Sequence, residues 1–364
     1  MTGEPPALTP EQTVDNERLI TELTQLIGSG EAIAFVGAGT SVAAGYDSWD
    51  NLLSKLQEVA LTADAGCNAL ALGQTRLSRA QALRECIRRR QGPEAYENAL
   101  GHLFRKKPVL TELHRQLVTL PFRGFVTTNY DSVLELAIDG TGIAKERCVP
   151  IAVYHASGKL LAGAVRSMTG SQLTSHVIHL HGHMDHPSTM VLCADEYAEA
   201  YGLLPEGSSE AGRPPQTRLW TLLTALLTTR RLVFVGFSLD DEYFASVLSR
   251  VTETLWEWDE AIHYAVMPIS TQNSAKLRVL AAALKHRMGI ETVFYEIHNG
   301  THDELRLLIN RIHSAVSPSH RPADLIARVA PEHAATVGPE AEELLAWARK
   351  TSAESRSRIE DSEN

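Results

Sequence analysis

The sequence predicts an α/β protein with a Rossmann-like parallel sheet, helices on both faces of that sheet, and a helical insert. Two observations predict this class. Six short, nearly continuous apolar runs alternate with segments of helical periodicity, as in parallel sheets that are buried on both faces. Glycine or polar motifs follow each of the first four runs, and open α/β sheets bind their ligands at the carboxyl ends of the strands.

The first strand is expected at Ala32–Val36, after an amphipathic helix over residues 16–27. It leads into a glycine turn at residues 37–39, where Thr40 and Ser41 are suitable N-cap residues for the next helix. A strand, a glycine turn and a helix N-terminus together favour an anion such as a phosphate. An ordinary glycine-rich turn between a strand and a helix is the alternative, because such turns are common.

Five further strands are expected, at residues 124–128, 177–180, 232–235, 263–267 and 292–296. The polar motifs after the second, third and fourth strands are Asn129-Tyr130-Asp131, His181-Gly182-His183 and Gly236-Phe237-Ser238. Amphipathic helices are expected over residues 49–61, 77–90, 108–120 and 303–315, and another helix begins near Val133. The first three of these helices make up the helical insert, at about residues 50–118.

One domain is expected over residues 15–316, with a second insert at about residues 184–230 that contains a glycine- and proline-rich loop. Residues 1–14 are polar and proline-rich and predict a disordered tail. Residues 317–364 predict either a second disordered tail or a docking segment, because residues 340–350 have the pattern of a short amphipathic helix.

The composition excludes several functional classes. The net charge of −10 argues against direct binding of nucleic acid by the chain as a whole. Basic clusters at residues 88–90 and 105–107 are expected to be solvated helix ends, a contact with an acidic partner being the alternative. No apolar run reaches the roughly 20 residues that cross a bilayer, and the N-terminus lacks the pattern of a secretory signal.

The four cysteines are far apart and form no CxxC pair, so neither a zinc module nor a disulfide framework is expected. This cysteine usage fits a reducing cytoplasm. The cysteines are Cys67, Cys86, Cys148 and Cys193.

His181 is the candidate general base. It directly follows a strand and precedes a glycine, so its ring can face a ligand, and the ordinary histidine pKa of about 6.5 suits proton transfer at neutral pH. His179 is expected to be buried and hydrogen-bonded, and His183 and His186 to be loop residues. A metal site would need further ligands from elsewhere in the chain, so no metal is expected.

Asn129 does not exchange protons at neutral pH, but its amide can hold a water, a ribose hydroxyl or a carboxamide. An asparagine in a turn after a strand is the alternative. Asp131 is either the N-cap of the next helix or a ligand contact. The sequence contains neither a GxxxxGK[ST] loop nor a GxSxG elbow, and Val42 replaces the third glycine of the dinucleotide fingerprint.

Four segments in this order resemble the sirtuin family, and more closely the sirtuin-like NAD-consuming domains of bacterial anti-phage defence. They are GAGTSVAAG (37–45), TTNYD (127–131), HLHG (179–182) and GFSLDD (236–241). The resemblance implies that His181 is the catalytic base and that Asn129 lies beside the nicotinamide ribose. The residues expected to bind NAD are Gly37, Ala38, Gly39, Thr40, Ser41, Trp49, Thr128, Asp131, Gly236 and Ser238.

Two departures from the protein deacylases of the sirtuin family argue against lysine deacylation. Asp50 stands where those enzymes carry an arginine, and Cys193 is the only cysteine where they carry a four-cysteine zinc module. The resemblance therefore implies an NAD glycohydrolase that releases nicotinamide and ADP-ribose and depletes NAD during phage defence. A nucleotide-binding partner subunit with little catalysis of its own is the alternative, and a deacylase is less favoured.

The same resemblance implies a homo-oligomer, with a HerA-type hexameric ATPase or a short Argonaute as a possible partner. No contact with a membrane is expected. The sequence indicates neither the trigger of activity nor the size of the oligomer, and it does not distinguish linear from cyclic ADP-ribose as the product.

Overall fold

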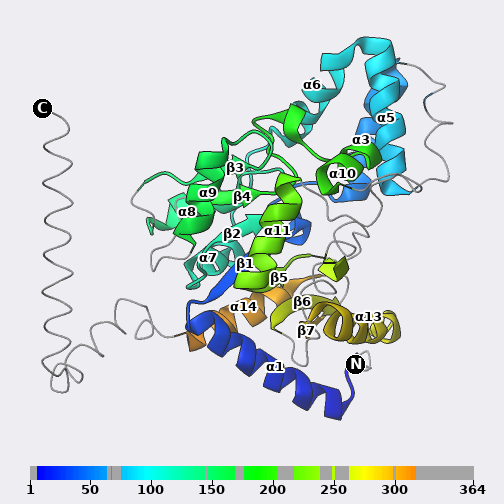
Figure 1. Cartoon of the computed structure of the whole chain (residues 1–364). Helices are drawn as coiled ribbons and strands as arrows, with labels where there is room; N and C mark the ends of the chain where they lie inside the picture. Colours follow the sequence, from blue (N-terminus) through cyan, green and yellow to red (C-terminus); the bar gives the residue numbers. More distant parts are fainter. Residues whose placement is uncertain are drawn as a thin grey trace, which may run out of the picture. The chain divides into compact units, whose positions relative to one another are not determined.

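The computed structural model describes residues 6–63, 67, 75–143, 146–168, 176–202, 217–237, 248–250, 262–297 and 301–316. These residues form a seven-stranded sheet with the strand order β3-β4-β2-β1-β5-β6-β7, and every neighbouring pair is parallel (Figure 1). The predicted Rossmann-like class is confirmed.

The strands are β1 (Ala32–Val36), β2 (Phe125–Thr127), β3 (Val149–Ala152), β4 (His176–His179), β5 (Arg231–Val235), β6 (His263–Ile269) and β7 (Ile290–Glu296). β1 lies between β2 and β5, and Val36 at its end pairs with Thr127 and Val235. From β1 the chain adds β2, β3 and β4 on one side of this strand, and it then adds β5, β6 and β7 on the other side. The strand order therefore reverses at β1. The carboxyl ends of these strands are therefore the expected place for a ligand.

The sequence does not predict β3. Its residues VPIA include Pro150, which lacks the N–H that a ladder hydrogen bond needs, and proline in sheets is confined to edges and bulges. In the described part of the chain β3 pairs with β4 and stands at the edge of the sheet. The strand is only four residues long and contains a proline, which argues against a strand in a sequence pattern, and this is why the sequence does not predict it.

Helices cover both faces of the sheet because successive residues of a strand point to opposite sides. Ile33 and Phe35 of β1 pack into a core with α9 (Gly158–Ser167), α10 (Ala194–Tyr201), α11 (Arg218–Thr229) and α13 (Ser274–Met288). Ala32, Ala34 and Val36 pack on the other side, with α1 (Pro10–Gly28), α7 (Glu112–Thr119), α8 (Val133–Thr141) and α14 (Asp303–Ala315).

A helical insert is present between β1 and β2 and has a core of its own, but the helix predicted at residues 108–120 is α7, which packs on the sheet and not in the insert. α3 (Trp49–Ala63), α5 (Arg76–Gln91) and α6 (Pro93–Phe104) contribute buried residues such as Leu53, Leu83 and Leu100. Tyr130 and Met190 from the ends of the sheet join the same core. The insert is therefore packed against the loops that follow β2 and β4.

The N-terminal helix corrects one expectation. Residues 10–14 belong to α1 rather than to a disordered tail, because Thr9 forms a capping box with Gln12 and Pro10 occupies the first turn. Residues 1–5 and 317–364 lie outside the described residues, as does the predicted loop at 205–215. The predicted domain boundaries stay a prediction.

A disulfide joins Cys67 and Cys86 inside the insert, contrary to the expectation from cysteine spacing. Their 19-residue separation carries no motif, and the fold brings the two Cα atoms to 6.1 Å from each other. Cys148 and Cys193 are buried free cysteines. In the described part of the chain, no helix combines the length and the apolar character that crossing a membrane requires.

Candidate functional site

A cavity of about 640 Å³ lies at the carboxyl ends of β1, β2, β4 and β5, a volume in the range of small-molecule and cofactor sites. Most of the predicted site residues line it: Ala38, Gly39, Ser41, Trp49, Thr128, Asn129, Asp131, His181 and Gly236. Gly37 and Thr40 are not among the residues that line it, and Ser238 lies outside the described residues. The fold thus brings together motifs from four separate strand ends.

Two glycine turns, one after β1 at residues 37–39 and one after β5 at Gly236, are in contact beside this cavity. The N–H of Gly39 donates to the carbonyl oxygen of Gly236 at 2.8 Å, and a Cβ atom on Gly37 would lie 2.5 Å from that oxygen. Gly236 has a φ of +68°, in the left-handed region that favours glycine. The turns after β1 and β5 can approach this closely only without side chains.

α2 (Ala38–Ala43) begins one residue after Gly37, which is its N-cap. Thr40 and Ser41 therefore lie inside the helix and do not cap it, contrary to expectation; the Thr40 hydroxyl instead donates to the carbonyl of Gly37 at 2.9 Å. The N–H groups of Gly37 and Gly39 are bonded to β5 and to the turn that follows it. These two N–H groups are therefore already used within the protein. If the turn contacts a ligand, it does so through the residues that line the cavity, Ala38, Gly39 and Ser41.

Asn129 presents a buried acceptor. Its Nδ2 donates to the Gly37 carbonyl at 3.0 Å and to Ser41 Oγ at 2.8 Å, which fixes the direction of the side chain. Its Oδ1 is buried and has no hydrogen-bond partner among the described residues. Buried polar atoms are rarely left without partners, so this oxygen points to a ligand or a bound water.

Asp131 combines both roles that the sequence left open. Its carboxylate accepts from the Val133 N–H at 3.0 Å at the start of α8, and the residue also lines the cavity. Burial raises the pKa of this carboxyl, while hydrogen bonds from Ser41 and Val133 oppose the rise. Asp131 thus both caps the start of α8 and forms part of the cavity lining.

His181 is held by two tyrosines from α10. Its Nε2 lies 2.7 Å from the Tyr201 hydroxyl and its Nδ1 lies 3.3 Å from the Tyr197 hydroxyl. The two phenol rings are stacked with centroids 5.7 Å apart, one helical turn from each other. Because a hydroxyl both donates and accepts, these partners suit the neutral and the protonated imidazole alike.

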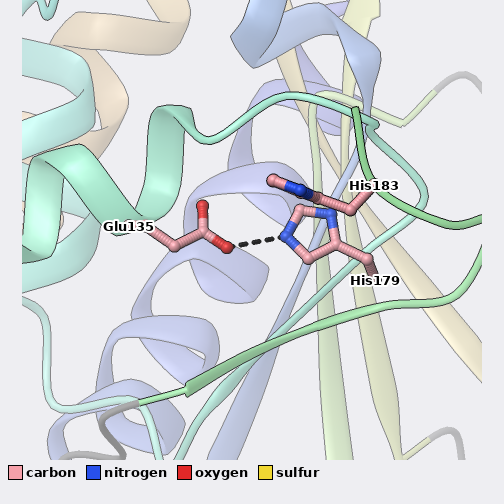
Figure 2. A group of neighbouring side chains, drawn as sticks. All are labelled: Glu135, His179 and His183. Atoms are coloured by element: carbon pink, nitrogen blue, oxygen red, sulfur yellow. Dashed lines mark hydrogen bonds and ion pairs between the residues drawn. The ribbon is translucent and has the colours of Figure 1, made fainter. Parts of the chain in front are cut away.

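His179 is buried and hydrogen-bonded, as expected, and it forms an ion pair. Its Nδ1 lies 2.8 Å from the carbonyl oxygen of Asn129, which can only accept, and its Nε2 lies 2.7 Å from Glu135 Oε1 (Figure 2). Burial opposes protonation of His179, but the charge and hydrogen bond of Glu135 outweigh it and raise its pKa. Glu135 thus holds the ring of His179, and His179 in turn binds the main-chain carbonyl of Asn129.

His183 is a loop residue, as expected, and it is also buried. Its Nδ1 accepts from the Asp185 N–H at 3.2 Å, and its Nε2 lies 2.9 Å from Ser132 Oγ. Burial, and next the neighbouring His179, lower its pKa to about 4. His183 is therefore neutral at physiological pH.

Glu135, His179 and His183 offer ligand atoms that lie within 4.8 Å of one another (Figure 2). One glutamate and two histidines are a ligand set that zinc accepts, so the expected absence of a metal stays a prediction. The hydrogen bonds described above account for both histidines, and Glu135 Oε2 is the atom of this group that lacks a partner among the described residues.

The chain is similar to known proteins over part of its length. Residues 123–292 match the family described as SIR2-like domain. This segment of the chain is similar to SIR2-like domains. The NAD(+) hydrolase ThsA of Bacillus cereus (strain MSX-D12) is 29% identical over 252 residues, which are 69% of this chain and 46% of that protein. The NAD(+) hydrolase ThsA of Enterococcus faecium is 26% identical over 259 residues, 70% of this chain and 46% of that protein. The chain thus spans about half the length of these relatives.

Several residues that line the cavity were not predicted as site residues from the sequence. Aromatic rings form much of the wall, at Tyr46, Phe104, Tyr130, Tyr197, Phe237 and Tyr295. Tyr130 and Phe237 lie in the strand-end motifs without having been predicted as site residues, and the other four rings lie outside those motifs. The spacing of Tyr197 and Tyr201 by four residues was the one signal available, since such a pair shares a helix face.

Proposed function

We propose that this chain is an NAD hydrolase that cleaves the bond between nicotinamide and ribose and releases nicotinamide and ADP-ribose. One observation carries the proposal: Asn129, whose Oδ1 lacks a partner among the described residues, and His181, whose imidazole is bound by two hydroxyls, line the same cavity at the strand ends. The similarity to NAD(+) hydrolases named ThsA supports it.

The chemistry requires a cation-like transition state and a proton acceptor. When the C1′–N bond breaks, its electron pair passes to the pyridinium ring, and nicotinamide leaves as a neutral base. A water oxygen bonds to C1′ of the ribose, and its proton is accepted by the imidazole of His181. Asn129 Oδ1 accepts a hydrogen bond from that water or from a ribose hydroxyl and so orients it.

The remaining residues of the cavity bind and enclose the substrate. Ala38, Gly39 and Ser41 lie at the glycine turn, where the pyrophosphate is expected. Trp49 and Thr128 line the same cavity and are expected to contact NAD, and Gly236 leaves room for it beside the turn. Ser238 stays a predicted contact.

The direct test is nicotinamide release from NAD by the purified chain, with His181→Ala and Asn129→Ala beside it. We expect each variant to be slower by about 10²–10⁴-fold, the usual contribution of acid–base and orienting groups. His186→Ala is the matched control, because this histidine is an exposed residue of the same loop, and its variant should keep the full rate.

Two results would contradict the proposal in different ways. NAD binding without nicotinamide release, by the chain alone and with the products of neighbouring genes, would favour the nucleotide-binding subunit instead. Release that persists in His181→Ala would leave the activity in place and remove its assigned base.

We further propose that NAD depletion by this chain serves anti-phage defence in the cytoplasm, and that assembly controls it. The resemblance to defence domains supports a homo-oligomer and a partner such as a HerA-type ATPase or a short Argonaute. Infection of cells that express the chain should lower their NAD, and cells with His181→Ala should keep it. Light scattering of the purified chain would measure the oligomer.

A further inference from the structure

Each ring nitrogen of the candidate base, His181, already has a hydrogen-bond partner within the protein. Both ring nitrogens of His181 lie within hydrogen-bond distance of a tyrosine hydroxyl, and the side chain is 2% exposed. A general base has to reach the proton that it removes, either directly or through a single intervening group. A proton that passes from a substrate to His181 therefore has to pass through, or displace, one of the two tyrosine hydroxyls.

The two tyrosines differ in their access to the cavity. Tyr197 lines the cavity together with His181, whereas Tyr201 is fully buried behind it. Nδ1 of His181 thus contacts the tyrosine that lines the cavity, and Nε2 contacts the fully buried one. The hydroxyl on the cavity side is placed to contact substrate, and the other hydroxyl is not.

We propose that the Tyr197 hydroxyl transfers the proton from the substrate oxygen to Nδ1 of His181, and that Tyr201 is the positioning residue that holds Nε2. This inference rests on the proposed NAD hydrolase function and specifies the proton path within its site. Tyr197 would touch the reacting water, while Tyr201 acts through His181.

The step balances with the groups present. The attacking water gives one proton to the Tyr197 oxygen as its own oxygen bonds to C1′. Tyr197 gives its original hydroxyl proton to the lone pair of His181 Nδ1, so the phenol stays neutral and the imidazole becomes charged. The C1′–N electron pair leaves with nicotinamide, and His181 later returns its proton to solvent.

The structure fixes the helix that carries both hydroxyls. Arg84 of α5 binds Asp195 and Glu196 in the first turn of α10, the Arg84–Glu196 contact being 2.7 Å. The Tyr154 hydroxyl donates to the Ala200 carbonyl at 2.9 Å near the other end of that helix. A relay needs donor and acceptor held at constant distance, and these contacts hold α10 in place.

The test is a steady-state comparison of Tyr197→Phe and Tyr201→Phe with the wild type. We expect Tyr197→Phe to lower kcat for NAD by about 10²–10⁴-fold while KM changes by less than about threefold, because the lost group acts on the transition state. Tyr201→Phe should lower kcat by about tenfold, the effect of one lost hydrogen bond. Tyr264→Phe is the matched control, since it removes a tyrosine hydroxyl that donates to Glu22 and does not line the cavity, and it should keep the wild-type kcat.

A second measurement does not depend on how the variants fold. In mixtures of light and heavy water, two protons moving in one step give a curved dependence of wild-type kcat on deuterium fraction. A curved dependence supports the relay. A straight line, with a single proton in motion, overturns it.

The outcomes separate this inference from the proposed function. A Tyr197→Phe variant as fast as the wild type, or faster, overturns the relay and identifies Tyr197 as a group that merely covers the base. A loss that appears in KM rather than in kcat overturns it as well. A wild type that releases no nicotinamide under any condition removes the proposed function and the relay together.

Discussion

At the scale of single residues, three histidines at the end of β4 differ because their neighbours differ. His179 faces a carboxylate, His183 accepts from a main-chain N–H, and His181 faces two hydroxyls. The first is held charged, the second neutral, and the third has partners that suit both forms. Of the three, only His181 lines the cavity, and both of its partners are hydroxyls that can donate or accept a hydrogen bond.

Glu135→Gln tests the buried ion pair. Removing the carboxylate leaves His179 buried without its counter-charge, and the free energy of unfolding should fall by about 3–5 kcal/mol. The folded-state pKa of His179 is raised, so its stabilisation is complete below the unfolded value of about 6.5 and disappears as the pH rises through the folded value.

Urea unfolding of the wild type and Glu135→Gln between pH 6 and pH 10 would measure this difference. The gap between the two proteins should be widest near pH 6 and should narrow in alkaline solution. Glu112→Gln, on an exposed part of α7, is the control and should cost less than about 1 kcal/mol. A gap that stays constant with pH would argue against a charged His179.

At the scale of elements, α10 links the helical insert to the candidate base. Arg84 lies on α5 of the insert and is almost fully buried, while its acidic partners begin the helix that carries Tyr197. A displacement of the insert would therefore move the hydroxyl that faces His181. This contact gives a physical path by which assembly through the insert would alter activity.

Arg84→Ala should loosen α10. We expect the free energy of unfolding to fall by about 1.5–3 kcal/mol, the range for hydrogen bonds to charged groups, and NAD hydrolysis to slow in parallel. Arg76→Ala is the matched control on the same helix, because its ion pair with Asp50 is exposed and should contribute at most about 1 kcal/mol. Denaturant unfolding and nicotinamide release measure both effects, and a stable Arg84→Ala with full activity would separate the insert from the site.

At the scale of the whole domain, the site depends on two turns that are distant in the sequence and touch in the fold. A Cβ atom on Gly236 would lie 2.9 Å from the Thr40 main chain, and the φ of +68° is unfavourable for any other residue. The sheet order places β5 beside β1, and this neighbourhood is what creates the contact. The contact of the two turns beside the cavity is thus a property of the sheet topology.

Gly236→Ala should strain the main chain where the turn after β5 contacts the turn after β1. We expect a loss of about 1–3 kcal/mol in the free energy of unfolding from backbone strain, and a marked loss of NAD binding because the turn has to shift. Gly163→Ala in α9 is the opposite control: a Cβ there meets no atom within 4 Å, and the change should stabilise the helix by about 0.5–1 kcal/mol. Thermal unfolding and NAD titration would measure both variants, and normal NAD binding by Gly236→Ala would contradict the close contact of the two turns.

Much of the fold and the outline of the site could be predicted from the sequence by itself, because apolar runs and strand-end motifs are local signals. They determined the class of sheet, six of its strands and the residues that meet at its carboxyl edge. The edge strand β3 was not predictable, since Pro150 interrupts its pattern. Only the tertiary structure shows which groups surround each histidine and what Tyr197 and Arg84 contact. The physical reason is that protonation and hydrogen bonding depend on neighbours, and here those neighbours come from helices far away in the sequence.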